Sequence, residues 1–552
     1  MAHLLKTAEL SFFRMAEDLI PSPDERRPLV RIFSLMRKAS VAWLRYDQRI
    51  TRADLRLHYP ALWQEIQDLR KEEPKTRVQV TQLTFYRQRP RKRGGATRET
   101  AVREPALLGT CILLRLNSPD GRKRRRYIYE ALISADALAG GARGPDYVVD
   151  LSSECTLVVA GRYFSALATY YAQQDGQRTV CAHACLKAAI WNSDPRDGSD
   201  WTFAPTTRWM NDIARQVAPP GWQPRKGMTP QQVKAICEEL DLDLRIIPFT
   251  HFLSPGLSPY EVAYLYASSG FPTLLVFKPS HKADDVEHLV PILGHRANPG
   301  EWLPIALSLY EEMPPHGARS PFRNFLPSVE WVSDLLIHDD LLGPYFSLSA
   351  GGLPRRPDMT DDYCGHATAV WVIGPRGICE GAPPNLAQIH AGVLVPNLVR
   401  DLWRRCPAKW RARLQWRWGG RGRRMATSLV LRTRFVTRED YVEHLRRSKD
   451  HLHNRSGLSA RVGDQVAQLL PEDMWMVEYT LPELRSANSA KIGEVLFPFQ
   501  IAPPAGAPSV LQAESGDQID QPVAHRFFGL LQLGADHELT LGFSSHIPFF
   551  RR

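Results

Sequence analysis

Residues 168–191, ATYYAQQDGQRTVCAHACLKAAIW, are the most informative part of the chain. The first half is a polar loop, and the second half is rich in Ala and Leu, which favour helix. Cys181 therefore lies at the start of a predicted helix. The partial positive charge of a helix N-terminus favours a thiolate over a thiol, so this position is typical of a nucleophilic cysteine.

Two later segments supply the base and the orienting group that a nucleophilic thiol needs. In DDVEHLVPILGHR (284–296), His288 begins an apolar run, which predicts a histidine at a strand end. In SVEWVSDLLIHDDLLGPY (328–345), an apolar strand leads into Asp339 and Asp340 before a Gly-Pro turn. The order Cys, His, Asp along the chain is typical of acyl transfer through a thiol.

At these residues the chain resembles the papain-like cysteine peptidases, most nearly the layout of the bacteriocin-processing (double-glycine) peptidases. In that group a Gln and a short polar loop precede the Cys, which is followed by small residues and a helix. The base begins a strand of the form His-apolar-apolar-apolar-x-Gly, and an Asp ends the next strand. The resemblance covers the chain from Gln174 to Asp339 and no more.

The resemblance implies a role for each matching residue. Cys181 would be the nucleophile, His288 the general base and later the general acid, and Asp339 the residue that orients the imidazole. Gln174 and the backbone N–H of Cys181 would form the oxyanion hole, where losing one donor typically costs about 10²- to 10³-fold in rate. An Asp stands where the family commonly has its Gln, so Gln177 is an alternative to Gln174.

Other positions of the triad also have alternatives. A long segment separates the predicted base from Asp339, so an insertion is expected there, and Asp340 and Asp334 are alternatives for the third residue. His366 begins another apolar strand and competes for the role of the base. Pro291 lies inside the predicted strand of the base, which favours an edge strand or a bulge.

Composition limits the class of protein. The chain has 552 residues, of which 43% are hydrophobic and 23% charged, and its mean hydropathy is −0.30, as in a soluble globular protein of several domains. The 8 cysteines are too sparse for a disulfide framework, which favours a reducing compartment. No apolar run approaches the ~18 residues of a membrane span. We therefore expect a cytoplasmic protein with no membrane partner, no cofactor and no metal.

Changes of pattern predict four regions. Helical periodicity predicts a helical leader over 1–75, and alternation predicts a β-rich basic domain over 76–160 with a hairpin turn at Pro119-Asp120-Gly121. Helices followed by strands predict an α+β domain over 161–360. The resemblance implies that this domain is papain-like, with the Cys-bearing helix packed on an antiparallel sheet. A β-rich C-terminal region with a basic, Trp-bearing hairpin is expected over 361–552.

The charge balance favours an anionic partner. Lys and Arg number 70 against 59 Asp and Glu, which gives a net charge of +11. Basic residues alternate with tryptophans between 400 and 424, a pattern that suits contacts to phosphates and bases but equally suits a hairpin with solvated arginines. The candidate residues for nucleic acid or an acidic protein are Arg404, Arg405, Trp410, Arg411, Arg413, Arg417, Arg421 and Arg423.

Three functions fit these observations. The first is a thiol-dependent hydrolase that cleaves a peptide or isopeptide bond in a protein or peptide substrate through a Cys181 acyl-enzyme. The second is a non-enzymatic binding protein with a degenerate papain-like core, whose basic surface engages nucleic acid or an acidic partner. The third is an acyltransferase that uses the same site. A zinc site at CAHAC is disfavoured because Cys181 and Cys185 share a helical face that His183 does not.

Overall fold

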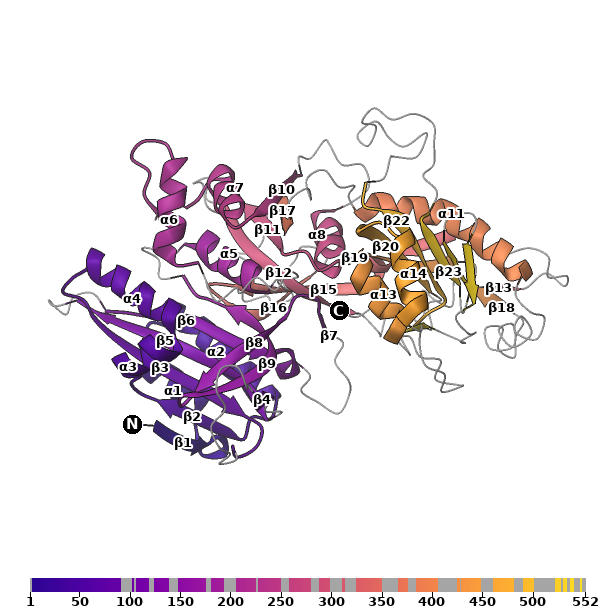
Figure 1. The fold of residues 1–552 in the computed structure, drawn as a ribbon. Coiled ribbons are helices and arrows are strands. Elements are labelled where there is room, and N and C mark those ends of the chain that lie inside the picture. The colour runs from indigo at the N-terminus through magenta and orange to yellow at the C-terminus, as the bar shows by residue number, and fades with distance from the viewer. Residues whose placement is uncertain are drawn as a thin grey trace.

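The protein is an α+β protein, as predicted, with three large, mainly antiparallel sheets that follow one another along the chain (Figure 1). None of the helices that the structure describes is long and apolar enough to cross a bilayer. The computed structural model describes residues 2–90, 102–103, 106–118, 124–138, 147–174, 180–192, 205–224, 227–249, 258–278, 287–297, 310–312, 324–349, 366–375, 384–405, 424–426, 428–447, 460–480, 490–500, 522–527, 530–533, 537–540 and 547–548.

The first large sheet is formed by strands between residues 2 and 171. Its order is β1-β2-β3-β5-β6-β9-β4, with β8 also paired to β9, and only β4 runs parallel to its described neighbour. β5 and β6 form the antiparallel hairpin that the turn sequence predicts. The strands are β1 (Ala2–Lys6), β2 (Trp43–Asp47), β3 (Arg77–Tyr86), β4 (Val102–Arg103), β5 (Leu107–Asn117), β6 (Arg124–Ser134), β8 (Ser153–Val159) and β9 (Arg162–Tyr171).

Two helix pairs cover the opposite faces of this sheet. Successive side chains of a strand alternate between the faces, so each central strand contributes to both cores. Leu83, Cys111 and Ile128 pack with α1 and α2, whereas Val80 and Leu114 pack with α3 and α4. β1 and β2 belong to this sheet, so the boundary expected at residue 75 falls between strands of the same sheet. The helices are α1 (Phe12–Leu19), α2 (Pro23–Lys38), α3 (Arg52–His58), α4 (Pro60–Glu72) and the 3₁₀ turns η1 (Thr7–Glu9) and η3 (Ala135–Ala137).

The central sheet has the order β10-β17-β11-β12-β15-β16, and β7 also pairs with β12. α5, α6 and α7 pack on one face of it and α8 on the other. The strands are β7 (Tyr147–Val149), β10 (Leu242–Pro248), β11 (Thr273–Lys278), β12 (His288–Ala297), β15 (Val332–Asp339), β16 (Gly343–Ser349) and β17 (His366–Pro375). The helices are α5 (Cys181–Asn192), α6 (Thr207–Gln216), α7 (Pro230–Glu239) and α8 (Pro259–Ser268).

Pro291 lies in an inner strand and not in an edge strand. It pairs with Leu274 of β11, whereas the pairing of β12 with β15 begins only at Ile292 and shifts in register before Gly294. The proline therefore precedes the paired part of β12 on the β15 side and lies next to a bulge, where a missing N–H is tolerated.

The third large sheet has the order β14-β19-β20-β22-β23-β24-β25, with α13 and α14 on one face. On its other face, α8 and α11 share one hydrophobic core with the central sheet. The strands are β14 (Asn324–Pro327), β19 (Ser428–Thr437), β20 (Asp473–Thr480), β22 (Gly493–Pro498), β23 (Ala524–Phe527), β24 (Leu530–Leu533) and β25 (His537–Thr540). The helices are α11 (Pro384–Arg405), α13 (Arg438–Arg447), α14 (Ala460–Leu469) and η5 (Ser328–Trp331). Two small sheets pair β13 (Tyr310–Glu312) with β18 (Arg424–Ala426) and β21 (Ala490–Lys491) with β26 (Ile547–Pro548).

Two expectations for the C-terminal region differ from the structure. β17 pairs with β10 and β11, so it belongs to the central sheet although it follows the boundary expected at 360. Residues 384–405 form the helix α11, where the pattern predicts mainly strands. This helix begins at Pro384, and proline is favoured at the first position of a helix because its missing N–H would be unpaired there anyway.

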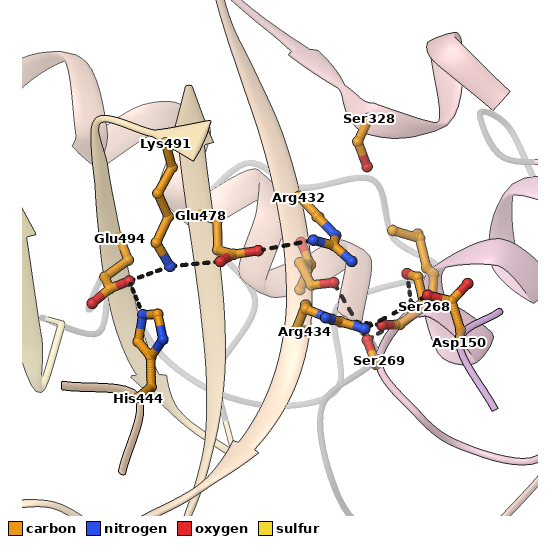
Figure 2. Close-up of polar contacts among 12 residues, drawn as sticks. Asp150, Ser268, Ser269, Ser328, Arg432, Arg434, His444, Glu478, Lys491 and Glu494 are labelled. Atoms are coloured by element: carbon orange, nitrogen blue, oxygen red, sulfur yellow. Dashed lines mark hydrogen bonds and ion pairs between the residues drawn. The ribbon is translucent and has the colours of Figure 1, made fainter. Parts of the chain in front are cut away.

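A series of charged side chains, buried except for the half-buried Arg432, runs through the third sheet toward the central sheet (Figure 2). Lys491 Nζ lies 2.5 Å from Glu478 Oε1 and also pairs with Glu494. Arg432 Nη1 lies 3.5 Å from Glu478 Oε2. Buried charges are costly unless they are paired, so each of these side chains depends on its neighbours in the series.

Arg434 and Asp150 continue this series across the interface between the two sheets (Figure 2). Arg434 Nη2 lies 3.6 Å from Asp150 Oδ1, and its Nε donates to the carbonyl of Ser268 at 2.7 Å. Asp150 Oδ2 in turn lies 2.7 Å from His295 Nδ1. Burial would raise the pKa of Asp150, but His295 and Arg434 outweigh it and the pKa is lowered. Because His295 belongs to β12, the C-terminal sheet helps to hold the strand that begins with His288.

Candidate active site

The start of α5 is fixed by a histidine inside the CAHAC segment. The Val180 N–H donates to His183 Nδ1 at 3.2 Å, and His183 Nε2 lies 2.9 Å from Asn211 Oδ1. This arrangement requires a neutral His183 that accepts at Nδ1 and donates at Nε2. The N–H groups of His183 and Ala184 both donate to the Val180 carbonyl. Of the first-turn donors, the N–H groups of Cys181 and Ala182 have no partner among the described residues and are placed to bind an anionic group.

His183 is a residue that the sequence analysis did not assign. A polar side chain at the third position of a helix that reaches back to the preceding backbone is a capping arrangement, and this spacing was the available signal. His183 therefore connects the backbone N–H just before Cys181 to the Asn211 side chain of α6. Cys181 is half-buried, whereas the other described cysteines, Cys111, Cys155, Cys185 and Cys237, are buried.

His288 lies between Cys181 and Asp339. Its Nε2 is 3.1 Å from Asp339 Oδ2, and the Cys181 side chain lies close enough to raise the pKa of His288 as a hydrogen-bond partner. Since Nε2 faces the carboxylate, Nδ1 is the ring nitrogen left for the thiol. Burial would lower the pKa of His288, but the charge and hydrogen bond of Asp339, the Cys181 contact and the charge of Asp340 outweigh it, and the pKa is raised well above 6.5. The site therefore favours an imidazolium beside the Cys181 sulfur.

Asp339 is held by the turn that follows β15. Its Oδ1 accepts from the N–H groups of Leu341 and Leu342, both at 2.8 Å, and its side chain is 0% exposed. The Tyr171 hydroxyl donates to the Asp339 carbonyl at 3.2 Å. One carboxylate oxygen is thus anchored to the backbone, which leaves the other directed at His288.

The Gly-Pro turn after Asp339 is braced by α2. Gly343 has a φ of +113°, and a Cβ placed there would lie 2.8 Å from Arg31 Cβ. Arg31 donates from Nε to the Pro344 carbonyl at 3.2 Å and also hydrogen-bonds with the Tyr345 carbonyl. A glycine is required because the backbone is left-handed and because α2 packs directly against it. The N-terminal unit therefore supports the loop that carries Asp339.

The structure separates the three candidate aspartates by their contacts. Asp340 Oδ1 is 3.8 Å from His288 Nε2, too far for a hydrogen bond. Burial raises the pKa of Asp340 to about 7; the charge of His288 opposes this rise and that of Asp339 adds to it. Asp334 lies further back on β15, where it accepts from the Ser333 hydroxyl and faces Arg296. Asp339 is the carboxylate hydrogen-bonded to His288.

We predict that Asp340→Asn stabilises the protein more at pH 8 than at pH 5. An unfolded aspartate ionises near pH 4, whereas folded Asp340 keeps its proton up to about pH 7, so the wild type loses stability as the pH rises between these values. The neutral amide removes this loss, and we expect a gain of roughly 1–3 kcal/mol at pH 8 relative to pH 5. Urea unfolding of both proteins at the two pH values measures it. An equal effect of the substitution at both values would contradict a raised pKa.

Cys185, one turn after Cys181, has a different environment. Its Sγ donates to the Leu289 carbonyl at 2.8 Å, and burial raises its pKa well above 9, with Asp340 adding to the rise. Cys185 is therefore held as a thiol. Because Cys185 lies on the same helix, its reactivity can be compared directly with that of Cys181.

Among the described residues, His288, Asp339 and Asp340 are the group whose atoms lie close enough to hold a metal ion, within 4.8 Å of one another. The donors are largely engaged already. Both oxygens of Asp339 accept hydrogen bonds, and the His288 ring contacts Asp339 and Cys181. A metal ion would have to break the contacts that orient His288, so the arrangement fits proton transfer better than metal binding.

Other predicted site residues are not brought to this cluster. Gln174 follows β9 and has no described contact with Cys181 or His288, and Gln177 lies outside the described residues. Strand β11 separates the backbone of His366 from β12, and the His366 side chain is not described. Arg404 and Arg405 end α11, and the remaining residues of the basic segment, Trp410, Arg411, Arg413, Arg417, Arg421 and Arg423, lie outside the described part of the chain.

Comparisons with known proteins assign no chemical role to the residues of this site. No protein-family model matches the chain, and no curated protein matches it. A half-buried thiol at a helix start, an imidazole hydrogen-bonded to it and a buried carboxylate behind the imidazole are together capable of nucleophilic acyl transfer.

Proposed function

We propose that the protein is a thiol-dependent hydrolase that cleaves a peptide or isopeptide bond, with a papain-like central domain. The observation that carries the proposal is the series of contacts from Cys181 through His288 to Asp339. The placement of these residues also supports it. α5, with Cys181 at its start, packs on a mainly antiparallel sheet in which His288 begins β12 and Asp339 ends the neighbouring β15.

In the proposed reaction the Cys181 thiolate attacks the carbonyl carbon of the scissile bond. The N–H groups of Cys181 and Ala182 stabilise the negative charge that develops on the carbonyl oxygen. The His288 imidazolium gives its proton to the leaving amine, and a thioester remains on Cys181. Neutral His288 then takes a proton from a water molecule, the hydroxide attacks the thioester, and the acid product leaves as the thiolate and imidazolium are restored.

Asp339 contributes by orientation and charge. Because its Oδ2 accepts the proton on Nε2, the neutral imidazole presents the lone pair of Nδ1 toward the thiol. Its negative charge stabilises the imidazolium formed in each half of the reaction. An amine or alcohol in place of water would give an acyltransferase by the same steps, so that alternative shares the acyl-enzyme and differs only in the acceptor.

Alkylation with limiting iodoacetamide at pH 6 and pH 8, followed by peptide mapping, tests the proposal without a known substrate. We expect Cys181 to react at least about 10-fold faster than Cys185 and Cys237 at pH 6, because reactivity requires a thiolate and access together. Cys185 is the matched control, since it lies one turn away on the same helix. A Cys181 that reacts no faster than Cys237 would refute an activated nucleophile. If Cys181 is fast, libraries of peptide and isopeptide substrates then separate hydrolysis from transfer to an added amine.

A further inference from the structure

One face of the first sheet carries a cluster of arginines at the edge where β3 and β6 begin and β5 ends. Arg115 pairs directly across the strands with Arg126, and Asn117 pairs with both Arg124 and Arg77. Direct cross-strand partners and residues two apart on one strand share a face. All four arginines therefore lie on one face, the face on which Leu113 and Ile128 pack with α1 and α2.

These arginines repel one another. The pKa of Arg126 is lowered, first by burial and then by the charges of Arg115 and Arg124. Like charges directly opposite each other destabilise a sheet, so the cluster has a cost in the free protein. On the opposite face Arg125 behaves differently, because it pairs with Glu73 at 2.6 Å.

No described carboxylate neutralises the cluster. Arg77 and Arg124 are exposed and form no ion pair with a described residue. Among the described residues Arg115 donates to the Asn117 side chain at 3.4 Å, and Arg126 donates to the carbonyls at the end of α1. Arg126 therefore has a structural role in capping α1, whereas the other three remain available to an anion.

The composition of this face indicates the class of anion. Next to the arginines it presents Gln79 and Asn117, and the half-buried Tyr46 beside Arg126 packs against the core under α1 and α2. A protein partner would be expected to cover aromatic or apolar side chains at the centre of an interface. Interfaces with nucleic acids are polar and strongly positive, and arginine binds phosphate in a planar, two-pronged geometry.

We propose that this arginine face binds the phosphate backbone of a nucleic acid. Binding neutralises the repulsion among the arginines and releases the counterions of the phosphates. The net charge of +11 attracts the same partner over a longer range. The contacts involve the backbone and no base edge, so we expect little dependence on base sequence. The proposal does not depend on Cys181, because the two sites use different residues.

Fluorescence anisotropy with a labelled 20-nucleotide DNA, single-stranded and duplex, tests the proposal with the full-length protein. We expect affinity to fall steeply as salt rises. The triple variant Arg77→Gln/Arg115→Gln/Arg124→Gln should bind at least about 10-fold more weakly at 0.1 M salt and should lose roughly 2 to 3 units of the log–log salt slope. The variant Arg77→Lys/Arg115→Lys/Arg124→Lys should keep most of the slope, which shows that a loss is due to charge.

The matched control is Arg27→Gln/Arg215→Gln/Arg446→Gln, which removes the same charge from exposed or half-buried arginines that already pair with carboxylates. It should change affinity by less than about 2-fold. Equal losses in the two glutamine variants would overturn the assignment of the site, as would binding that does not respond to salt. If poly-glutamate of equal charge competes as well as unlabelled DNA, the partner is an acidic protein and the proposal is wrong.

Discussion

Replacing His288 with alanine is expected to slow the alkylation of Cys181 by iodoacetamide at pH 6 by about 100-fold. An ordinary thiol has a pKa near 8.5, so well under 1% of it is thiolate at pH 6. In the wild type the raised pKa of His288 keeps an imidazolium beside the sulfur at this pH, which favours the thiolate. Alanine removes that charge. The second-order rate constant at Cys181, from quenched time points and peptide mapping, measures the effect.

The same measurement at about pH 10 is the control for His288→Ala. An ordinary thiol is ionised there without a neighbouring cation, so the charge of His288 adds little. The alkylation rate constants of Cys181 in the two proteins should therefore agree to within a few-fold at this pH. A 100-fold deficit that persists at pH 10 would indicate lost access or misfolding, and equal rates at pH 6 would refute the thiolate–imidazolium pair.

Asp339→Asn is expected to lower the rate of substrate hydrolysis, once a substrate is found, by about 10²- to 10⁴-fold. The N–H groups of Leu341 and Leu342 both donate to Oδ1, so the amide oxygen of an asparagine is drawn to that position. Its NH₂ group then faces His288 Nε2 and donates to it. The neutral ring must carry its proton on Nδ1, toward Cys181, where it cannot accept the thiol proton.

Asp340→Asn is the matched control, because it makes the same chemical change one residue along the chain. Asp340 is 3.8 Å from His288 Nε2 and keeps its proton below about pH 7, so an asparagine resembles the form already present at pH 6. We expect activity at pH 6 within about 3-fold of the wild type. If Asp340→Asn were the damaging change and Asp339→Asn the tolerated one, the order of the two aspartates in the mechanism would be reversed.

The local surroundings of the candidate site follow from short sequence patterns. A polar loop before an Ala-rich run predicts a helix start at Cys181, and an apolar run after His288 predicts a strand start; α5 and β12 begin at these residues. Asp339 ends β15, as the apolar run before the Gly-Pro turn predicts. These features depend on propensity and periodicity over about ten residues, so the sequence alone is sufficient for them.

Three-dimensional packing decided what those patterns left open. Asp339 and Asp340 are adjacent in sequence, and only the turn that binds Asp339 Oδ1 shows which carboxylate contacts His288. The membership of β1 and β2 in the first sheet and of β17 in the central sheet depends on strand pairing between residues far apart in the chain. The arginine face likewise appears only once the β3, β5 and β6 registers are known. Hydrogen bonds and strand registers are set by contacts between distant residues, and local sequence carries little information about those contacts.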